Sequence, residues 1–224
     1  MKSKVESPST AAPLLVPPPR PGAGGTPATP GVNGHHYGDG NGAGEATLSL
    51  VPPDGPVPPD AVVTPEDFRA ALRHFPSGVT IVTLRAGDEV HGLTVSAFAS
   101  VSPVPPLVVV AIDHKHYAHE LLQREGAVFG VNILHHGQRE LSDRFAWVKD
   151  EDRFAVGNWT TAVTGAPILA DAAAWLDCTI HSQMPAGTHT LFVGEVRASG
   201  VPVIDRPPLI YWSRSYRALD LAQG

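Results

Sequence analysis

The chain has 224 residues, which suits one domain of ordinary size, with or without an unstructured extension. Hydrophobic residues make up 42% of the sequence, and the formal net charge of −6 provides no overall positive field to attract nucleic acid or anionic lipid. The single cysteine, Cys178, excludes a disulfide framework within the chain and a metal site built from several cysteines.

Residues 1–63 differ in composition from the rest of the chain. They hold 13 of the 23 prolines and 10 of the 22 glycines, and Tyr37 is their only aromatic residue. A segment so poor in large apolar groups cannot offset the entropy lost when its backbone becomes ordered. We therefore predict a disordered tail over 1–63, either a plain solvated tether or a docking arm, and one folded domain over 64–224.

The folded domain is predicted to begin with a helix. Thr64-Pro65-Glu66-Asp67 combines a capping hydroxyl, a proline in the first turn and two acidic residues near the positive end of the helix dipole. Phe68, Leu72 and Phe75 recur at helical spacing, and Pro76-Ser77-Gly78 ends the helix.

Most of the remaining domain is predicted to be strand. Runs of β-branched and other apolar residues bounded by turn residues predict strands at 79–84, 90–98 with a continuation through 99–102, 107–112, 127–133, 175–182, 188–198 and 209–212. Shorter helices are predicted at 117–123 and 138–145. Six or more strands joined mostly by short turns predict a mainly β, predominantly antiparallel barrel.

Two of these strands carry a finer prediction. In the strand at 175–182, apolar and polar side chains alternate, which predicts one buried face and one wet face. The inward side chains would be Leu176, Cys178 and Ile180, and the outward ones Asp177, Thr179 and His181. Cys178 is therefore expected to be an inert core thiol. Gly194, in the following strand, is expected to mark a β-bulge.

The hydrophobic pattern does not predict a membrane protein. The longest apolar stretch in the expected domain is 107–112, whereas a transmembrane helix needs roughly 18 residues. Residues 5–19 lack the unbroken apolar segment of a signal peptide. We therefore expect a cytoplasmic protein that binds neither a membrane nor nucleic acid.

Hydroxyl side chains recur along the stretch 91–102. Thr94, Ser96, Ser100 and Ser102 fall at even positions, so in an extended chain they would share one side. Hydroxyls and exposed amide groups are what a phosphate or the polar edge of a ring needs from a neutral surface. The alternative is an ordinary exposed strand face, where serine and threonine are common.

Histidines also gather in the sequence and raise the question of a metal. His114, His116 and His119, with His135 and His136, could supply imidazole ligands. No carboxylate or cysteine completes an obvious ligand set, so we expect no metal site. Solvated or phosphate-facing histidines are the better interpretation.

A series of short motifs resembles the flavin-reductase family of two-component flavin monooxygenase systems. In chain order they are Phe75-Pro76-Ser77-Gly78-Val79-Thr80, Gly92-Leu93-Thr94-Val95-Ser96-Ala97-Phe98, Ser100-Val101-Ser102, Pro105-Pro106-Leu107, Phe129-Gly130-Val131-Asn132-Ile133-Leu134, Leu141-Ser142, Phe145-Ala146, Asp152-Arg153-Phe154, Gly165-Ala166-Pro167-Ile168-Leu169, Gly187-Thr188-His189, Gly194-Glu195-Val196 and Pro208-Leu209-Ile210-Tyr211. Each motif alone is weak, but their shared order makes the resemblance specific, and it spans roughly Phe68 to Leu219.

The resemblance implies a fold, a reaction and a set of site residues. The fold would be a split β-barrel of the antiparallel Greek-key type, in a homodimer with flavin near the subunit interface. Members use NADH or NADPH to reduce FMN or FAD, and the reduced flavin passes to a separate oxygenase. Carried over by position, the residues that would contact the flavin are Thr94, Val95, Ser96, Ala97, Ser100, Val101 and Ser102. Asn132 would lie near the same site, and His189 would lie beside the isoalloxazine ring, where nicotinamide stacks.

Two positions depart from the family pattern. A basic residue followed by Ser-x-Thr is replaced here by His114-Lys115-His116-Tyr117-Ala118, so Lys115 and a protonated His116 would have to supply charge at the phosphate site. The common Gly-Asp-His is Gly187-Thr188-His189, which keeps the histidine and loses the carboxylate.

We therefore predict an NAD(P)H:flavin oxidoreductase that supplies reduced flavin to a partner monooxygenase. Hydride transfer needs two stacked and aligned rings and no side-chain nucleophile, which agrees with the missing nucleophile motifs and dinucleotide fingerprint. Two alternatives stay open: a non-catalytic flavin carrier, and a barrel oxidoreductase that retains its flavin.

Overall fold

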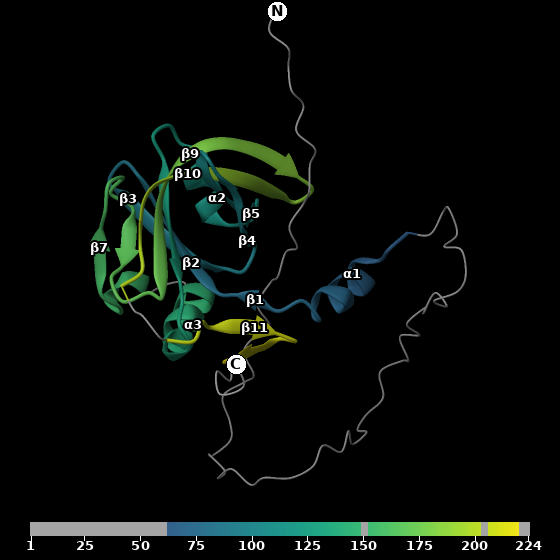
Figure 1. Cartoon of the computed structure of the whole chain (residues 1–224). Helices are drawn as coiled ribbons and strands as arrows, with labels where there is room; N and C mark the ends of the chain where they lie inside the picture. Colours follow the sequence, from purple (N-terminus) through teal and green to yellow (C-terminus); the bar gives the residue numbers. More distant parts are fainter. Residues whose placement is uncertain (1–61, 149–151, 203–205, 220–224) are drawn as a thin grey trace, which may run out of the picture. The chain divides into compact units, whose positions relative to one another are not determined.

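The computed structural model describes residues 62–148, 152–202 and 206–219 (Figure 1). The predicted tail up to residue 61 lies outside the described residues. The described residues fall into two compact units, 62–71 and 72–219. No helix among the described residues is long and apolar enough to cross a bilayer.

Helix α1 (Pro65–Leu72) begins where the sequence predicted and ends earlier. The Thr64 hydroxyl accepts a hydrogen bond from the backbone N–H of Asp67 at 3.1 Å, which satisfies one free donor of the first turn. The predicted continuation to Phe75 is wrong, because the helix ends at Leu72 and the chain leaves it in a turn.

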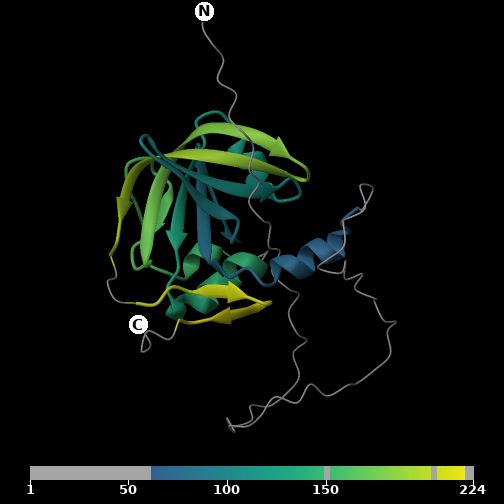
Figure 2. The same ribbon diagram turned by 45° about the vertical axis from the view of Figure 1, so that its right-hand side comes forward.

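One antiparallel sheet of seven strands makes up most of the domain, in the spatial order β3-β2-β6-β9-β10-β5-β4. Its strands are β2 (Thr80–Ala86), β3 (Glu89–Val95), β4 (Phe98–Pro103), β5 (Pro106–Asp113), β6 (Val128–Ile133), β9 (Ala174–Ala186) and β10 (His189–Gly200). The edge strands β3 and β4 are joined by only Ser96 and Ala97, so the sheet has to curl until its two edges meet. This closure confirms the predicted mainly antiparallel β fold, and Figures 1 and 2 show the curled sheet.

The predicted strand through 90–102 is therefore wrong as one element. It breaks at Ser96–Ala97, and the two halves pair with different neighbours: β3 with β2, and β4 with β5. The expected bulge at Gly194 is confirmed by a register shift between Val193 and Gly194 where β10 pairs with β9.

Smaller elements complete the fold. They are the strands β1 (Ser77–Gly78), β7 (Trp159–Thr161), β8 (Pro167–Leu169), β11 (Ile210–Trp212) and β12 (Ser215–Arg217), the helices α2 (Tyr117–Leu122) and α3 (Arg139–Trp147), and the single turns η1 (His136–Gln138) and η2 (Arg153–Ala155). The prediction that 209–212 is the last strand is wrong, because β12 follows and pairs with β11.

Two apolar clusters hold the domain together. The first fills the barrel with side chains such as Val82, Phe129 and Phe192, and α2 adds Leu121 to it. The second cluster joins α3 to the small sheet β1-β11-β12 through side chains such as Phe145. Figure 2 shows this small sheet and α3 together at one end of the barrel.

Asp177 departs from the predicted face pattern of its strand. The expectation that it faces water is wrong: its side chain is fully buried, whereas Cys178 is buried as predicted. Strand β9 lies between β6 and β10, and the loop at 164–166 covers its other face. The carboxylate accepts hydrogen bonds from the backbone N–H of Thr164 at 2.7 Å and from the Thr164 hydroxyl, which compensates for its burial.

Candidate functional site

A cavity of about 610 Å³ opens between β3, β5, β10 and the end of α3. Five of the residues proposed from the sequence line it: Thr94, Val95, Lys115, His116 and His189. Its other walls include apolar and aromatic side chains of Tyr117, Phe145 and Trp147. This size and mixture of surfaces suits a nucleotide or another planar ligand of similar size.

Ser96 and Ala97 line a second cavity of about 370 Å³, which Phe75 and Phe98 also border. A third, smaller hollow has Thr94 in common with the first cavity and Ser96 in common with the second. The Thr94 hydroxyl is already engaged, because it donates a hydrogen bond to the carbonyl of Ser142 at 2.6 Å. Toward a ligand, Thr94 therefore offers its backbone and the lone pairs of its hydroxyl oxygen.

The three remaining residues of the serine-rich stretch lie on edge strand β4. Ser100, Val101 and Ser102 line neither of these two cavities. Ser100 pairs with Val108 and Ser102 with the adjacent Leu107, so Val101 is an extra bulged residue. Residues paired across strands share a face and successive residues alternate, so Ser100 and Ser102 point to opposite faces. The expectation that all four hydroxyls share one side is therefore wrong.

Asn132 has a role inside the fold. It is fully buried and donates to the Ile81 carbonyl at 3.0 Å and to the Thr83 hydroxyl at 3.3 Å. The side-chain oxygen Oδ1 of Asn132 accepts a hydrogen bond from the backbone N–H of Leu169 at 2.7 Å. The side chain ties β6 to β2 and β8, and it lines neither of the two cavities.

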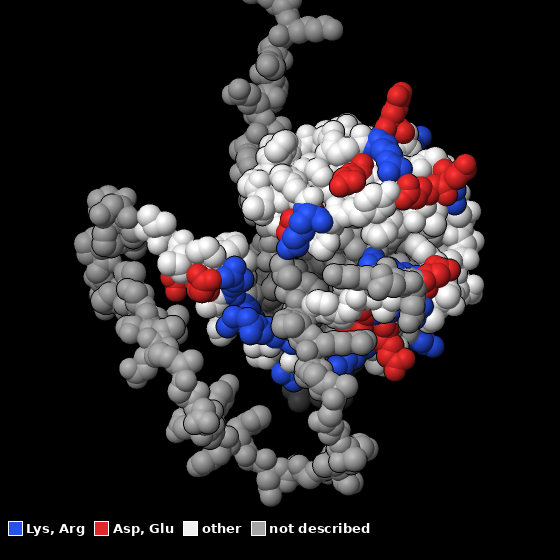
Figure 3. Space-filling model, turned by 180° about the vertical axis from the view of Figure 1, so that it is seen from behind, with Lys and Arg blue, Asp and Glu red and all other residues white. Residues whose placement is uncertain are grey.

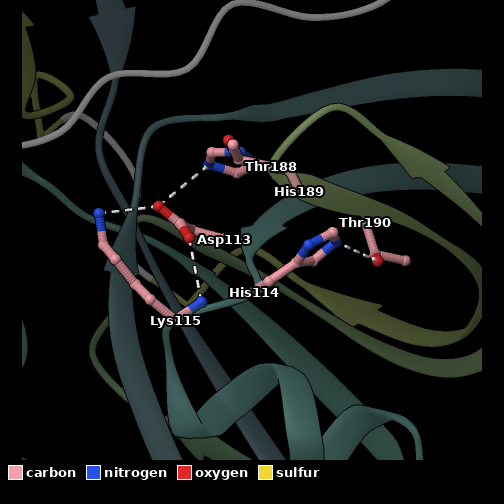
Figure 4. Close-up of polar contacts among 6 residues, drawn as sticks. All are labelled: Asp113, His114, Lys115, Thr188, His189 and Thr190. Carbon is pink, nitrogen blue, oxygen red and sulfur yellow. Dashed lines mark hydrogen bonds and ion pairs between the residues drawn. The ribbon is translucent and has the colours of Figure 1, made fainter.

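The His189 ring lies close to the Asp113 carboxylate (Figure 4). It pairs directly with Asp113 across β10 and β5, which puts both side chains on one face, with Nε2 at 3.9 Å from Oδ2. Nδ1 lies 2.9 Å from the Thr188 hydroxyl. Burial lowers the pKa of His189, and the Asp113 carboxylate opposes that effect. The imidazole is therefore expected to be mainly neutral at neutral pH.

Of the two residues expected to supply positive charge to a phosphate, Lys115 is already paired with a carboxylate and His116 has a lowered pKa. Lys115 Nζ forms an ion pair with Asp113 Oδ2 at 2.8 Å, and the Lys115 backbone N–H donates to Oδ1 at 3.0 Å. Burial lowers the pKa of His116, with Asp113 opposing it, so a protonated His116 is not favoured near neutral pH.

A second group lies on the opposite side of the same strand pair. His114 and His119 approach the Thr190 hydroxyl at 3.1 and 2.9 Å, and their ring centroids are 4.7 Å apart. Thr190 follows His189 on β10, so its side chain points away from the cavity. These contacts brace the strands behind His189.

Sequence reasoning did not single out Arg153, which also lines the 610 Å³ cavity. Its Nη1 donates to the Gly92 carbonyl at 2.7 Å and its Nε to the Val148 carbonyl at 2.6 Å. The signal available in the sequence was the Asp152-Arg153-Phe154 motif, which is distant in the chain from the other predicted contacts.

Fold and site together define a β-barrel protein with a nucleotide-sized cavity. Residues 72–220 match the family model of the flavin reductase like domain. The chain is 40% identical over 160 residues to the reductase component of an FADH(2)-dependent resorcinol hydroxylase from Rhizobium sp. (strain MTP-10005), covering 70% of this chain and 88% of that protein. It is 39% identical over 165 residues to an NADH-dependent flavin reductase of Rhodococcus sp, covering 72% and 90%.

Solved structures agree with these sequence relatives. The NADH:FAD oxidoreductase of Streptomyces globisporus C-1027, in complex with NAD and FAD fragments, superposes with a TM-score of 0.66 at 32% identity, over 73% of this chain and 99% of that one. The chain therefore belongs to the flavin reductase-like domain family, and it is an NAD(P)H-dependent flavin reductase.

Proposed function

We propose that the 610 Å³ cavity binds FMN or FAD next to NADH or NADPH, and that the reduced flavin leaves for a separate flavin-dependent oxygenase. The observation that supports this most is the meeting of Thr94, Val95 and His189 in one cavity, from strands far apart in sequence. The resorcinol hydroxylase relative is named as a reductase component, which supports an oxygenase partner.

The residues present fit a flavin. Aromatic and apolar walls suit a planar ring, and the backbone at Thr94 and Val95 offers polar groups to its edge. Arg153 supplies positive charge for a phosphate, whereas the charge of Lys115 is already paired with Asp113. When bound, the flavin would supply a ring that accepts a hydride from the nicotinamide, so the protein has to align two planar groups.

In this proposal, His189 positions the nicotinamide. Its imidazole is hydrogen-bonded through Nδ1 to the Thr188 hydroxyl, and its Nε2 lies on the side of Asp113. A neutral ring held in this way can pack against a second planar group or hydrogen-bond to its carboxamide. Ser96 and Ala97 would extend the flavin site toward the second cavity.

We also propose that the chain acts as a homodimer. Exposed apolar side chains lie near the second cavity and on the edge strand β4 and its turn: Phe75 is 55% exposed, Val101 53% and Val104 87%. A second copy would cover such side chains, and it would bring Ser100, Val101 and Ser102 to a subunit interface. Light scattering should give twice the mass of one chain, and a monomer at micromolar concentration would contradict this proposal.

The function is tested by mixing the protein with NADH or NADPH and either flavin, and following the loss of nicotinamide absorbance. His189→Ala should weaken NAD(P)H use more than flavin binding, and equal loss of both would contradict the role assigned to His189. Tight flavin binding without NAD(P)H oxidation would favour a carrier. Yellow colour retained through gel filtration, with turnover that depends on another substrate, would favour a flavin-retaining oxidoreductase.

A further inference from the structure

The backbone around Arg153 is fixed by several contacts. The carboxylate of Asp152 accepts a hydrogen bond from the N–H of Phe154 at 2.9 Å and caps the turn η2. The ring of Phe154 packs edge-on against Phe145 at 5.2 Å between centroids. Arg144 donates to the carbonyls of Arg153 and Asp152 at 3.2 and 2.8 Å. The start of the Arg153 side chain is therefore placed rigidly beside the cavity.

The guanidinium of Arg153 is held by neutral groups. Its two hydrogen bonds, at 2.7 and 2.6 Å, go to the backbone carbonyls of Gly92 and Val148. These bonds use Nε and one hydrogen of Nη1, and Nη2 has no hydrogen-bond partner among the residues that the structure describes. Arg153 also forms no ion pair with a carboxylate of any described residue.

Such a cation is unusual, because a half-buried charge is normally paired. Burial lowers the pKa of Arg153, but a guanidinium starts so high that it stays protonated at neutral pH. Lys115, in the same cavity, already has Asp113 as a counter-ion at 2.8 Å. Burial also lowers the pKa values of His91 and His116. Arg153 is thus the cavity cation whose charge no described group balances.

We propose that Arg153 binds a phosphate group of the flavin nucleotide, an inference that rests on the proposed function. A guanidinium presents a planar fork of donors that matches phosphate oxygens, and here two of its donors are already fixed. A negatively charged phosphate would supply a counter-charge that no residue in the described part of the chain provides. Arg153 bonds to Gly92, two residues before Thr94 on β3, so it lies beside the part of the cavity assigned to the flavin. This assignment takes over the phosphate role that the sequence gave to Lys115 and His116.

The test compares riboflavin, FMN and FAD as ligands of the full chain, by fluorescence titration without nicotinamide. Riboflavin has the same ring and no phosphate. Arg153→Gln should weaken FMN and FAD binding about 10- to 100-fold, the usual effect of losing a charge-assisted hydrogen bond, and leave riboflavin binding within about twofold. Arg153→Lys should fall between Arg153→Gln and the unchanged chain, because it keeps the charge and loses the fork.

Arg197→Gln is the matched control. It removes the same charge from a residue half-exposed on β10, where Arg197 pairs with Glu195, outside the cavity. It should leave all three affinities unchanged. Unchanged riboflavin binding also shows that Arg153→Gln is folded.

The outcomes separate this inference from the proposed function. Equal weakening of riboflavin and FMN would show that Arg153 only braces the fold, and no weakening of either would also overturn the inference. A rise in the KM for NADPH or NADH alone, with FMN binding unchanged, would assign the phosphate to the nicotinamide nucleotide and overturn the flavin assignment. If the unchanged chain bound no flavin at all, the proposed function itself would fail.

Discussion

Asp113 is expected to set the pH at which His189 takes up a proton. The Asp113 Oδ2 and His189 Nε2 atoms are 3.9 Å apart, and their side chains are only 15% and 10% exposed. Two unit charges about 4 Å apart attract by about 1 kcal/mol in bulk water and by about 4 kcal/mol near a protein surface. The carboxylate therefore favours protonated His189 by an energy between these bounds, reduced by the Lys115 charge at 2.8 Å from the same oxygen.

Asp113→Asn removes this charge and keeps the size of the side chain. The pKa of His189 should fall further, because burial and the cation of Lys115 both lower it and would then act unopposed. His116 in the same cavity and His114 on the opposite side of the strand pair also lower the pKa of His189 when charged. If neutral His189 positions the nicotinamide, the decline of kcat/KM for NADH on the acid side should move to lower pH. Proton NMR of the histidine rings measures the same titration directly.

Lys115→Met provides a control of opposite sign. It removes the cation that lowers the pKa of His189 and leaves Asp113 in place, so the acid-side decline should move to higher pH. Both variants break the same ion pair, so general damage to the cavity would move both profiles alike. Shifts in the same direction, or no shift in either variant, would refute the reasoning.

Two further predictions concern the packing of the domain. Gly92→Ala would place a Cβ 2.5 Å from Cε1 of Phe145, and such overpacking costs about 1–3 kcal/mol, so thermal unfolding should occur several degrees lower. Gly78→Ala, where a Cβ would meet nothing within 4 Å, should change the midpoint little, and equal effects would contradict the argument. Burial raises the pKa of the Cys178 thiol to about 12, so a thiol reagent at pH 8 should react only after denaturation, and rapid reaction of the folded protein would contradict this.

The longer strands were predictable from local pattern, whereas their partners and the short strands β1, β7, β8 and β12 were not. Continuous or alternating apolar residues mark β5 and β6 correctly, because local side-chain pattern is enough to define a strand. The break at Ser96 and Ala97 depends on barrel closure, which brings two edges of the sheet together, and no short stretch of sequence records that. The same limit explains Asp177, whose burial depends on a loop thirteen residues earlier that covers the outer face of β9.

The sequence predicted which residues meet at the site better than it predicted which of their charges are paired. Thr94 and His189, which come from two motifs of the series, lie in one cavity, together with Lys115 from a stretch that departs from the family pattern. Its place at the family's phosphate position and its positive charge made Lys115 a candidate phosphate ligand, yet Asp113 at the adjacent strand end is its counter-ion. Arg153 is the converse case, since the acidic Asp152 beside it in sequence bonds to the backbone of Phe154, and no carboxylate among the described residues pairs with the guanidinium.

Charge available to a ligand is therefore a property of pairs of residues. A cation that is already paired with a carboxylate of the protein is less available to bind a phosphate. Which carboxylate lies next to it is decided by strand register and by the geometry of turns. Lys115, with its partner Asp113, therefore mainly affects the pKa of His189. The Arg153 guanidinium is instead available to an anionic ligand bound in the cavity. The two cations of one cavity should thus affect different ligands, Lys115 the pH dependence of nicotinamide use and Arg153 the affinity for the flavin phosphate.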